Sequence, residues 1–348
     1  SFGVRVGARL QDPDKPKNMT EIHLDNAYDT TAEARFHGAV NDYFSWVANF
    51  NANLEGATLA APGSVGIMDL IAQFKAVDEF QIWAGRLLVP SDRSNFSGPF
   101  FSLPWNYPGF YVAGPPLGPK DGPTGRDQGV TVWGNALDAK LKYYAGVYGL
   151  DQGSPVSTVP KGANPYFSGR LSYSIQGSEP GYFGSSTYYG AKDVVTIGIA
   201  GQYEKDGIVT PTGTKDRGTF MADALVEENV AGTGTFTFEG QFYKFTDDDP
   251  FGSTTLPAAG SPVMPKEAFY VLAAYLTPNP IGIGKIQPLV RLQQTADPAW
   301  TIFDAALAYV WKDYSGRLVL TYQHIEGGST LPGGTANAMQ LGVQLQTL

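Results

Sequence analysis

Apolar and polar residues alternate along most of the chain. In the first segment Phe2, Val4 and Val6 are separated by small or polar residues, and the same pattern recurs down to residues 339–346. A period of two predicts β-strands with one apolar and one polar face. Counted in this way, the sequence predicts about sixteen strands of roughly ten residues each. We therefore expect an all-β protein.

The predicted strands are joined alternately by short turns and long loops. Residues 42–43 and 232–234 form turn-sized connections, whereas residues 12–31 and 247–266 form long ones. Such alternation places every second connection at the same end of an up-and-down structure. An even number of antiparallel strands with asymmetric ends is typical of outer-membrane barrels, and in lipid only closure satisfies both sheet edges. We predict one domain over residues 1–348, a transmembrane antiparallel up-and-down β-barrel.

The longest connection covers residues 89–125 and is rich in proline and glycine, so we expect no regular structure there. A loop of about 35 residues is usually either disordered or functional. Aromatic residues are rare in disordered segments, and this loop contains Phe96, Phe100, Phe101, Trp105, Tyr107, Phe110 and Tyr111. We therefore predict a packed loop that folds into the barrel and narrows its lumen.

Composition removes several classes of function. The chain has no cysteine and three histidines, so thiolate chemistry, disulfides and a histidine metal cluster are not expected, and no cofactor is predicted. The net charge of −9 disfavours nucleic acid as a partner. No apolar run is long enough for a membrane-spanning helix. The N-terminal residues lack the charged start and apolar core of a signal peptide, so we expect a processed bacterial outer-membrane protein.

The polar faces of the strands are predicted to line water, because a barrel of about sixteen strands is too wide for side chains to fill. Basic residues outnumber acidic ones on this wall, which would favour anions within a screening length of about 8 Å. In the alternative interpretation, these arginines pair with carboxylates of neighbouring strands and set no preference. The candidate pore-lining and constriction residues are Arg5, Arg9, Arg35, Lys75, Arg86, Asp92, Arg93, Lys142, Arg170, Asp223, Glu239, Arg291 and Arg317, with Asp69, Lys140, Glu227 and Lys285 also assigned to the wall.

Four motifs occur in order along the chain: Gly85-Arg86 before the long loop, Gly125-Arg126-Asp127-Gln128-Gly129 after it, Tyr143 to Gly149, and Gln340 to Gln346. Together they resemble the phosphate-selective porin O and P family of Gram-negative outer-membrane porins. The resemblance implies a sixteen-stranded, trimeric porin with an inward-folded third loop, in contact with lipid and lipopolysaccharide and passing small ions and solutes. Members that concentrate phosphate carry lysines on that loop, whereas residues 89–110 contain Arg93 and no lysine. Phosphate specificity is therefore not implied.

Two other classes of function remain open. The barrel could be the sheath of an outer-membrane electron-transfer conduit, but this needs a wider lumen than sixteen strands with an inserted loop would leave. A soluble all-β carbohydrate-active enzyme would need two carboxylates about 5–10 Å apart. Asp223 and Glu239, on adjacent predicted strands, could supply them, although no sequence signature marks them. We predict a passive diffusion channel that is not an enzyme.

Overall fold

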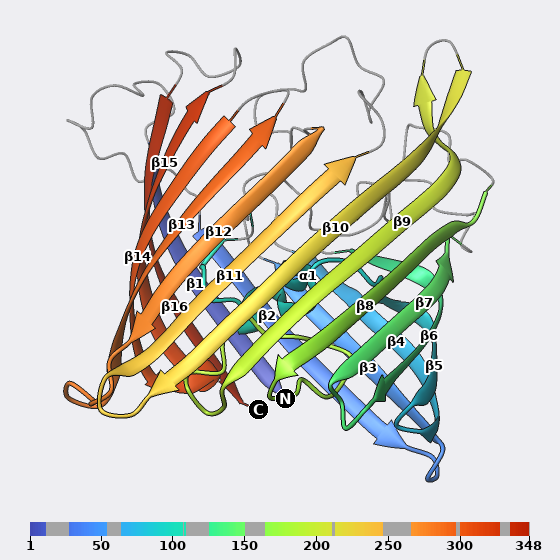
Figure 1. Cartoon of the computed structure of the whole chain (residues 1–348), viewed down its shortest axis with the longest axis horizontal. Helices are drawn as coiled ribbons and strands as arrows, with labels where there is room; N and C mark the ends of the chain where they lie inside the picture. Colours follow the sequence, from blue (N-terminus) through green and yellow to red (C-terminus); the bar gives the residue numbers. More distant parts are fainter. Residues whose placement is uncertain are drawn as a thin grey trace.

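The computed structural model describes residues 1–11, 28–53, 64–106, 108, 125–149, 164–210, 213–245, 266–296, 300–327 and 335–347. These residues form a closed barrel of sixteen strands, in which each strand pairs antiparallel with its sequence neighbours and β1 pairs with β16 (Figure 1). Closure leaves no sheet edge unpaired. The predicted all-β, up-and-down barrel is confirmed.

The strands match the predicted alternating segments in order. Their bounds are β1 (Phe2–Gln11), β2 (Tyr28–Ala39), β3 (Phe44–Asn53), β4 (Ser64–Val77), β5 (Phe80–Leu88), β6 (Arg126–Ala136), β7 (Leu141–Tyr148), β8 (Tyr166–Gln176), β9 (Val194–Thr210), β10 (Gly213–Val230), β11 (Gly234–Phe245), β12 (Glu267–Leu276), β13 (Lys285–Ala296), β14 (Trp300–Lys312), β15 (Gly316–Gly327) and β16 (Thr335–Thr347).

The two faces of the sheet differ in the way that the alternation predicts. In β15, Leu318, Leu320 and Tyr322 are between 37% and 43% exposed, whereas Val319 and Thr321 between them are 2% and 5% exposed. Side chains at alternate positions point to opposite faces of a strand. Large apolar residues therefore cover the outside of the barrel, and most of the buried polar residues face its interior.

Two connecting regions contain regular structure. β9 and β10 continue over residues 205–210 and 213–217 as a hairpin that rises beyond the neighbouring strands (Figure 1). The β-branched residues Ile208, Val209 and Thr210 favour this extended conformation. Within the predicted constriction loop, residues 93–101 form the helix α1 (Arg93–Phe101). The rest of that loop beyond residue 106 lies largely outside the described residues.

The helix α1 is short and interrupted. The carboxylate of Asp92 caps its N-terminus by accepting a hydrogen bond from the backbone N–H of Asn95 at 3.1 Å. Gly98 has φ 60° and ψ −178°, and Pro99 follows it. A positive φ favours glycine and proline lacks a backbone N–H, so these two residues break the helix. Among the described residues, no helix is long and apolar enough to cross a membrane.

At the end of the barrel where both chain termini lie, one connection between strands is unusually long. The described turns at residues 40–43, 78–79 and 231–233 are short and lie at the end where both chain termini lie (Figure 1). Residues 177–193, which join β8 to β9 at this same end, fold back to contact α1. The backbone N–H of Gly184 donates to Phe96 O at 3.3 Å, and that of Ser186 donates to Phe101 O at 3.0 Å. We call residues 177–193 the inner segment.

Candidate functional site: a constriction inside the barrel

Arginines of the barrel wall hold the segment around α1 inside the ring of strands (Figure 1). Each of them is at most 7% exposed and donates a hydrogen bond to a backbone carbonyl of this segment. The pairs are Arg170 with Ser91 at 2.8 Å, Arg317 with Leu103 at 3.0 Å, Arg5 with Trp105 at 2.6 Å, and Arg291 with Asn106 at 3.0 Å. These predicted lumen arginines therefore anchor the loop through its main chain.

Small residues of β1 and β16 admit the aromatic rings of the loop. A Cβ atom built on Gly342 would lie 2.4 Å from the indole ring of Trp105, and one on Gly7 would lie 3.2 Å from it. The guanidinium of Arg5 lies 4.0 Å from the centre of the same ring, a cation–π contact. Because only glycine leaves room for the ring at position 342, the wall and the loop fit at this point.

Two of the wall arginines also form buried ion pairs. Arg170 donates to both carboxylate oxygens of Asp223, at 2.5 and 2.8 Å. Arg291 lies directly opposite Asp304 on the neighbouring strand and donates to it at 2.7 Å. The alternative interpretation of the basic wall, pairing with carboxylates across strands, thus describes Arg170 and Arg291. Their charges are largely neutralised before any solute arrives.

A buried ion pair joins α1 to the inner segment. Arg93 donates to the two carboxylate oxygens of Glu179 at 2.8 and 2.6 Å and to the carbonyl of Ser185 at 2.8 Å. Burial disfavours the charge of Glu179, but the attraction and hydrogen bonds of Arg93 outweigh it and hold the pKa of Glu179 well below its ordinary range. Arg93 is therefore a clamp between two inserted segments.

The inner segment is also fixed to the wall by Glu227 of β10. Its carboxylate accepts hydrogen bonds from the hydroxyls of Thr187 at 2.6 Å and Thr237 at 2.9 Å. It also accepts from the backbone N–H groups of Tyr188 and Gly190, both at 2.9 Å. Glu227 is fully buried, as a lumen-facing position predicts, and its charge serves to hold the inner segment.

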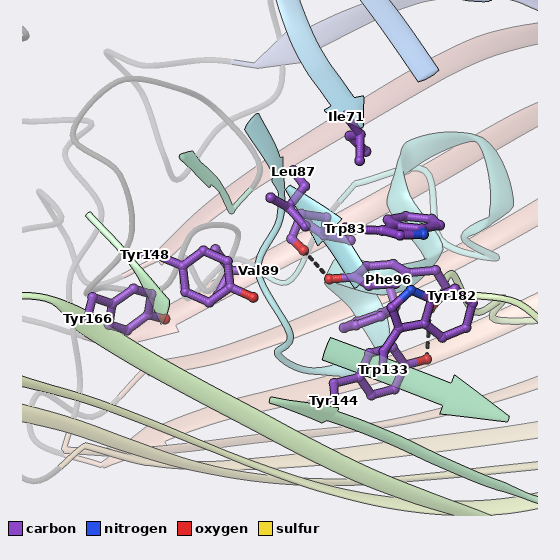
Figure 2. Close-up of a cluster of buried hydrophobic side chains, with 11 residues drawn as sticks. Ile71, Trp83, Leu87, Val89, Phe96, Trp133, Tyr144, Tyr148, Tyr166 and Tyr182 are labelled. Atoms are coloured by element: carbon purple, nitrogen blue, oxygen red, sulfur yellow. Dashed lines mark hydrogen bonds between the residues drawn. The ribbon is translucent and has the colours of Figure 1, made fainter. Parts of the chain in front are cut away.

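An aromatic cluster fills one side of the interior (Figure 2). Tyr182 of the inner segment stacks on Trp83 of β5, with ring centres 4.3 Å apart and planes at 14°, and lies 5.5 Å from Phe96 of α1. Its hydroxyl donates to Leu88 O at 2.6 Å, and the hydroxyl of Tyr144 donates to Tyr182 O at 2.9 Å. The cluster packs the wall, α1 and the inner segment into one unit, so this side of the lumen is closed.

A cavity of about 380 Å³ remains beside α1, and we call it the eyelet cavity. Residues 95–101, residues of the inner segment and the inner faces of β1, β2, β3 and β16 line it. Its charged lining residues are Glu33, Arg35, Arg126, Glu179 and Lys192. Arg126 pairs with Asp69 at 3.1 Å. The eyelet cavity is the candidate passage.

Of the remaining predicted site residues, Arg35 lines the eyelet cavity and Lys142 is buried on the lumen face of β7. Asp92 caps α1. Lys75, near the end of β4, pairs with Asp78 at 2.5 Å; both side chains are exposed, and Lys75 is not among the residues that line the eyelet cavity. For Arg9, only the backbone in β1 lies within the described part of the chain.

Arg86 was predicted to face the lumen, and its placement differs. It lies directly opposite Leu70 of β4 and Gln128 of β6, which are both exposed. The buried residues Gln81, Trp83 and Leu87 lie at alternate positions of β5 and face inward. Residue 86 therefore belongs to the outward set, because successive side chains of a strand alternate between faces.

Sequence reasoning missed several lining residues. Glu179 and Lys192 lie in the inner segment, where no strand period predicts which way a side chain points. Arg126 of β6 and Glu33 of β2 also line the eyelet cavity. Arg126 follows Gly125 at the end of the long loop, and this motif is the one signal in the sequence that could have marked it.

Asp223 and Glu239, the pair considered for sugar hydrolysis, are both engaged by other groups. Asp223 is held by Arg170 as described above, and Glu239 accepts hydrogen bonds from Gln241 at 3.0 Å, from Ser186 and from Tyr270. The two residues are 5% and 4% exposed and are not among the residues that line the eyelet cavity. Their arrangement is that of structural anchors.

Three solved structures are similar over almost the whole chain, at 11–13% sequence identity. The anion-selective porin from Comamonas acidovorans has a TM-score of 0.56 at 11% identity, covering 99% of this chain and 98% of that one. Salmonella typhi OmpF in complex with daunomycin has a TM-score of 0.61 at 12% identity, covering 100% and 97%. A loop L8 deletion mutant of OmpT, an outer membrane protein of Vibrio cholerae, has a TM-score of 0.53 at 13% identity, covering 99% and 98%.

No protein-family model matches the sequence, and no curated protein matches it. At such low identity, the three structures establish the fold alone. Together with the sixteen paired strands, they show that this chain has the closed barrel fold of bacterial outer-membrane porins.

Proposed function

We propose that the protein is an outer-membrane porin, a water-filled channel for passive diffusion of small ions and solutes with a preference for anions. The observation that carries the proposal is a closed barrel with an apolar exterior and a cavity left open beside an inserted loop. A barrel of this strand number is wide enough to hold an aqueous channel. In this function the chain acts through its shape and charge, and no residue performs chemistry.

The preference for anions is inferred from the charges left unpaired at the eyelet cavity. The charge of Glu179 is neutralised by Arg93, and that of Arg126 by Asp69. Within the described part of the chain, no ion pair neutralises Arg35 or Lys192, and Glu33 is the opposing carboxylate. The balance is one positive charge in excess, which attracts anions over about one screening length.

The resemblance to the phosphate-selective porin O and P family supports the same class, and from it we also propose a homotrimer in contact with lipid and lipopolysaccharide. We do not extend the proposal to phosphate specificity. Arg93, the basic residue of the loop on which that specificity would rest, is committed to Glu179 and Ser185. Chemical cross-linking of the detergent-solubilised protein tests the trimer.

Planar bilayer recording tests the channel directly. Purified protein added to a lipid bilayer in KCl should produce discrete, long-lived current steps, because a permanently open eyelet needs no stimulus. Across a KCl gradient, the reversal potential should have the sign expected when chloride permeates more readily than potassium. Protein that inserts into the bilayer without current steps would reject the proposal. A haem stain of the same preparation addresses the electron-conduit alternative, for which the packed aromatic cluster leaves little room.

Replacing Arg35 with Glu should shift the reversal potential toward cations. Two unit charges 4 Å apart interact by about 1 kcal/mol in water, so we expect the chloride-to-potassium permeability ratio to fall roughly two- to fivefold. Arg86→Glu is the matched control, because Arg86 lies on the outward face of β5 opposite Leu70. A larger shift from Arg86→Glu than from Arg35→Glu would contradict both placements.

Replacing Leu320 with Arg should destabilise the barrel in lipid. Leu320 is 43% exposed and lies opposite Leu307 and Leu341 on the two neighbouring strands, so it belongs to the apolar outer face. An arginine at the bilayer midplane costs about 2–4 kcal/mol, whereas one near the interface costs about 0–1 kcal/mol. Ile175→Arg, one residue before the end of β8, is therefore the control. Urea unfolding in lipid vesicles measures both, and equal losses would argue against the proposed membrane span.

A further inference from the structure

Two of the cations that line the eyelet cavity each lie against an aromatic ring that also lines it. The guanidinium of Arg35 lies 4.8 Å from the ring centre of Phe183, and the ammonium group of Lys192 lies 3.9 Å from that of Tyr188. Phe100 and Tyr314 line the same cavity. Charged side chains attract small inorganic ions, whereas aromatic rings do not help to bind them. The rings therefore point to a solute with an apolar part.

In the described part of the chain, neither of these two cations forms an ion pair, although the carboxylates of Glu33 and Glu179 line the same cavity. Arg35 contacts the face of Phe183 and forms no ion pair there, and Lys192 donates to the carbonyl of Ser178. Glu179, which lies in the same cavity, is already satisfied by Arg93. Buried or half-buried cations are stabilised by an opposite charge at short range. An anion in the eyelet cavity would supply that charge.

We propose that the eyelet cavity binds monovalent anions that carry a flat aromatic ring, such as simple aromatic monocarboxylates. The carboxylate lies toward Arg35 and Lys192, and the ring packs against Phe183 and the neighbouring rings. The inference rests on the proposed function, because the channel gives the solute access to the cavity. The volume of about 380 Å³ falls within the range of small-molecule sites, roughly 300–1,000 Å³.

The carboxylate of Glu33 sets a limit on the charge of the solute. Glu33 lines the same cavity as Arg35 and lies two residues before it on β2. A second negative charge on the solute would lie within reach of Glu33, where like charges repel. The cavity should therefore bind a monocarboxylate more tightly than a dicarboxylate of the same ring.

Single-channel recording of the full chain with benzoate as the probe tests this inference. Benzoate should interrupt the chloride current at concentrations at least about tenfold lower than acetate does, because ring packing adds to the charge interaction that both share. Cyclohexanecarboxylate carries the same charge on a ring that is not flat and should block more weakly than benzoate. Equal potency of benzoate with either of the other two anions would overturn the proposal.

Substitutions of the lining residues locate the block. Phe183→Leu should weaken the block by benzoate severalfold while leaving that by acetate unchanged, and Arg35→Gln should weaken both. Phe80→Leu is the control for the first, since Phe80 is 42% exposed on the outer face, and Arg86→Gln is the control for the second. Benzoate block that survives Phe183→Leu unchanged would place the ring elsewhere and overturn the proposal. A protein without any current overturns the proposed function, whereas a conducting channel that ignores benzoate overturns this inference alone.

Discussion

Replacing Glu179 with Gln should lower the free energy of unfolding by about 3 kcal/mol and make the open-channel current noisier. The substitution leaves the buried guanidinium of Arg93 without its bidentate partner, and an uncompensated buried charge costs about 3–5 kcal/mol. The lower end of that range applies because the carboxylate of Asp223 lies 3.7 Å from Arg93. Urea unfolding in lipid and single-channel recording measure the two effects.

The control for this experiment is an ion pair of the same kind on the surface. Lys244 and Glu267 pair at 2.8 Å, with side chains that are 59% and 44% exposed. Exposed pairs contribute about 0–1 kcal/mol, so Glu267→Gln should change stability very little. If Glu179→Gln were as well tolerated as Glu267→Gln, with unchanged current noise, then Arg93 would not be clamping α1 to the inner segment.

The period of two accounts for what the sequence could predict. It places Arg5, Arg170, Arg291 and Arg317 on the inner face, and all four lie there. The same period places residue 86 outside, and the contrary prediction for Arg86 relied on its place at the strand exit beside the constriction loop. An outward arginine costs little near the end of a strand, about 0–1 kcal/mol close to the membrane interface, so its charge carries no information about facing.

The role of the wall arginines could not be predicted from strand periodicity. A strand pattern says which face a guanidinium is on, but the group it meets there depends on the path of the loop. Residues 91–106 present backbone carbonyls to Arg170 and Arg317, and each carbonyl buried in this way needs a donor. The basic residues that looked like a charged pore wall are largely the donors that an inserted loop requires.

The position of the inner segment could not be predicted from the sequence, for a related reason. Residues 177–193 contain few periodic apolar positions, and their placement is decided by partners far away in the sequence, Arg93 of α1 and Glu227 of β10. The constriction is therefore built from both ends of the barrel. Its size depends on the contacts between these two connections.

The charge state of Asp92 gives the constriction a dependence on pH. Asp92 is 1% exposed at the start of α1. Burial raises its pKa to about 7, although the backbone N–H of Asn95 stabilises the charged form, and the nearby carboxylate of Asp223 adds to the rise. A carboxyl group whose pKa is raised by folding binds its proton more tightly in the folded state. Its contribution to stability is therefore fully present below the ordinary pKa of 3.8 and is lost as the pH rises through about 7.

Asp92→Asn should remove this dependence. Moving the pKa from 3.8 to about 7 corresponds to about 4 kcal/mol, so the native protein should lose several kcal/mol of stability between pH 4 and pH 8 that the variant retains. Asparagine still caps the helix, which keeps α1 intact and isolates the effect of charge. The measurement is the free energy of unfolding in urea at the two pH values, with Asp78→Asn, in the exposed pair with Lys75, as the control. If the native protein and Asp92→Asn lose stability in parallel, Asp92 is already charged at pH 4. A cation of the wall around α1 would then have to stabilise that charge.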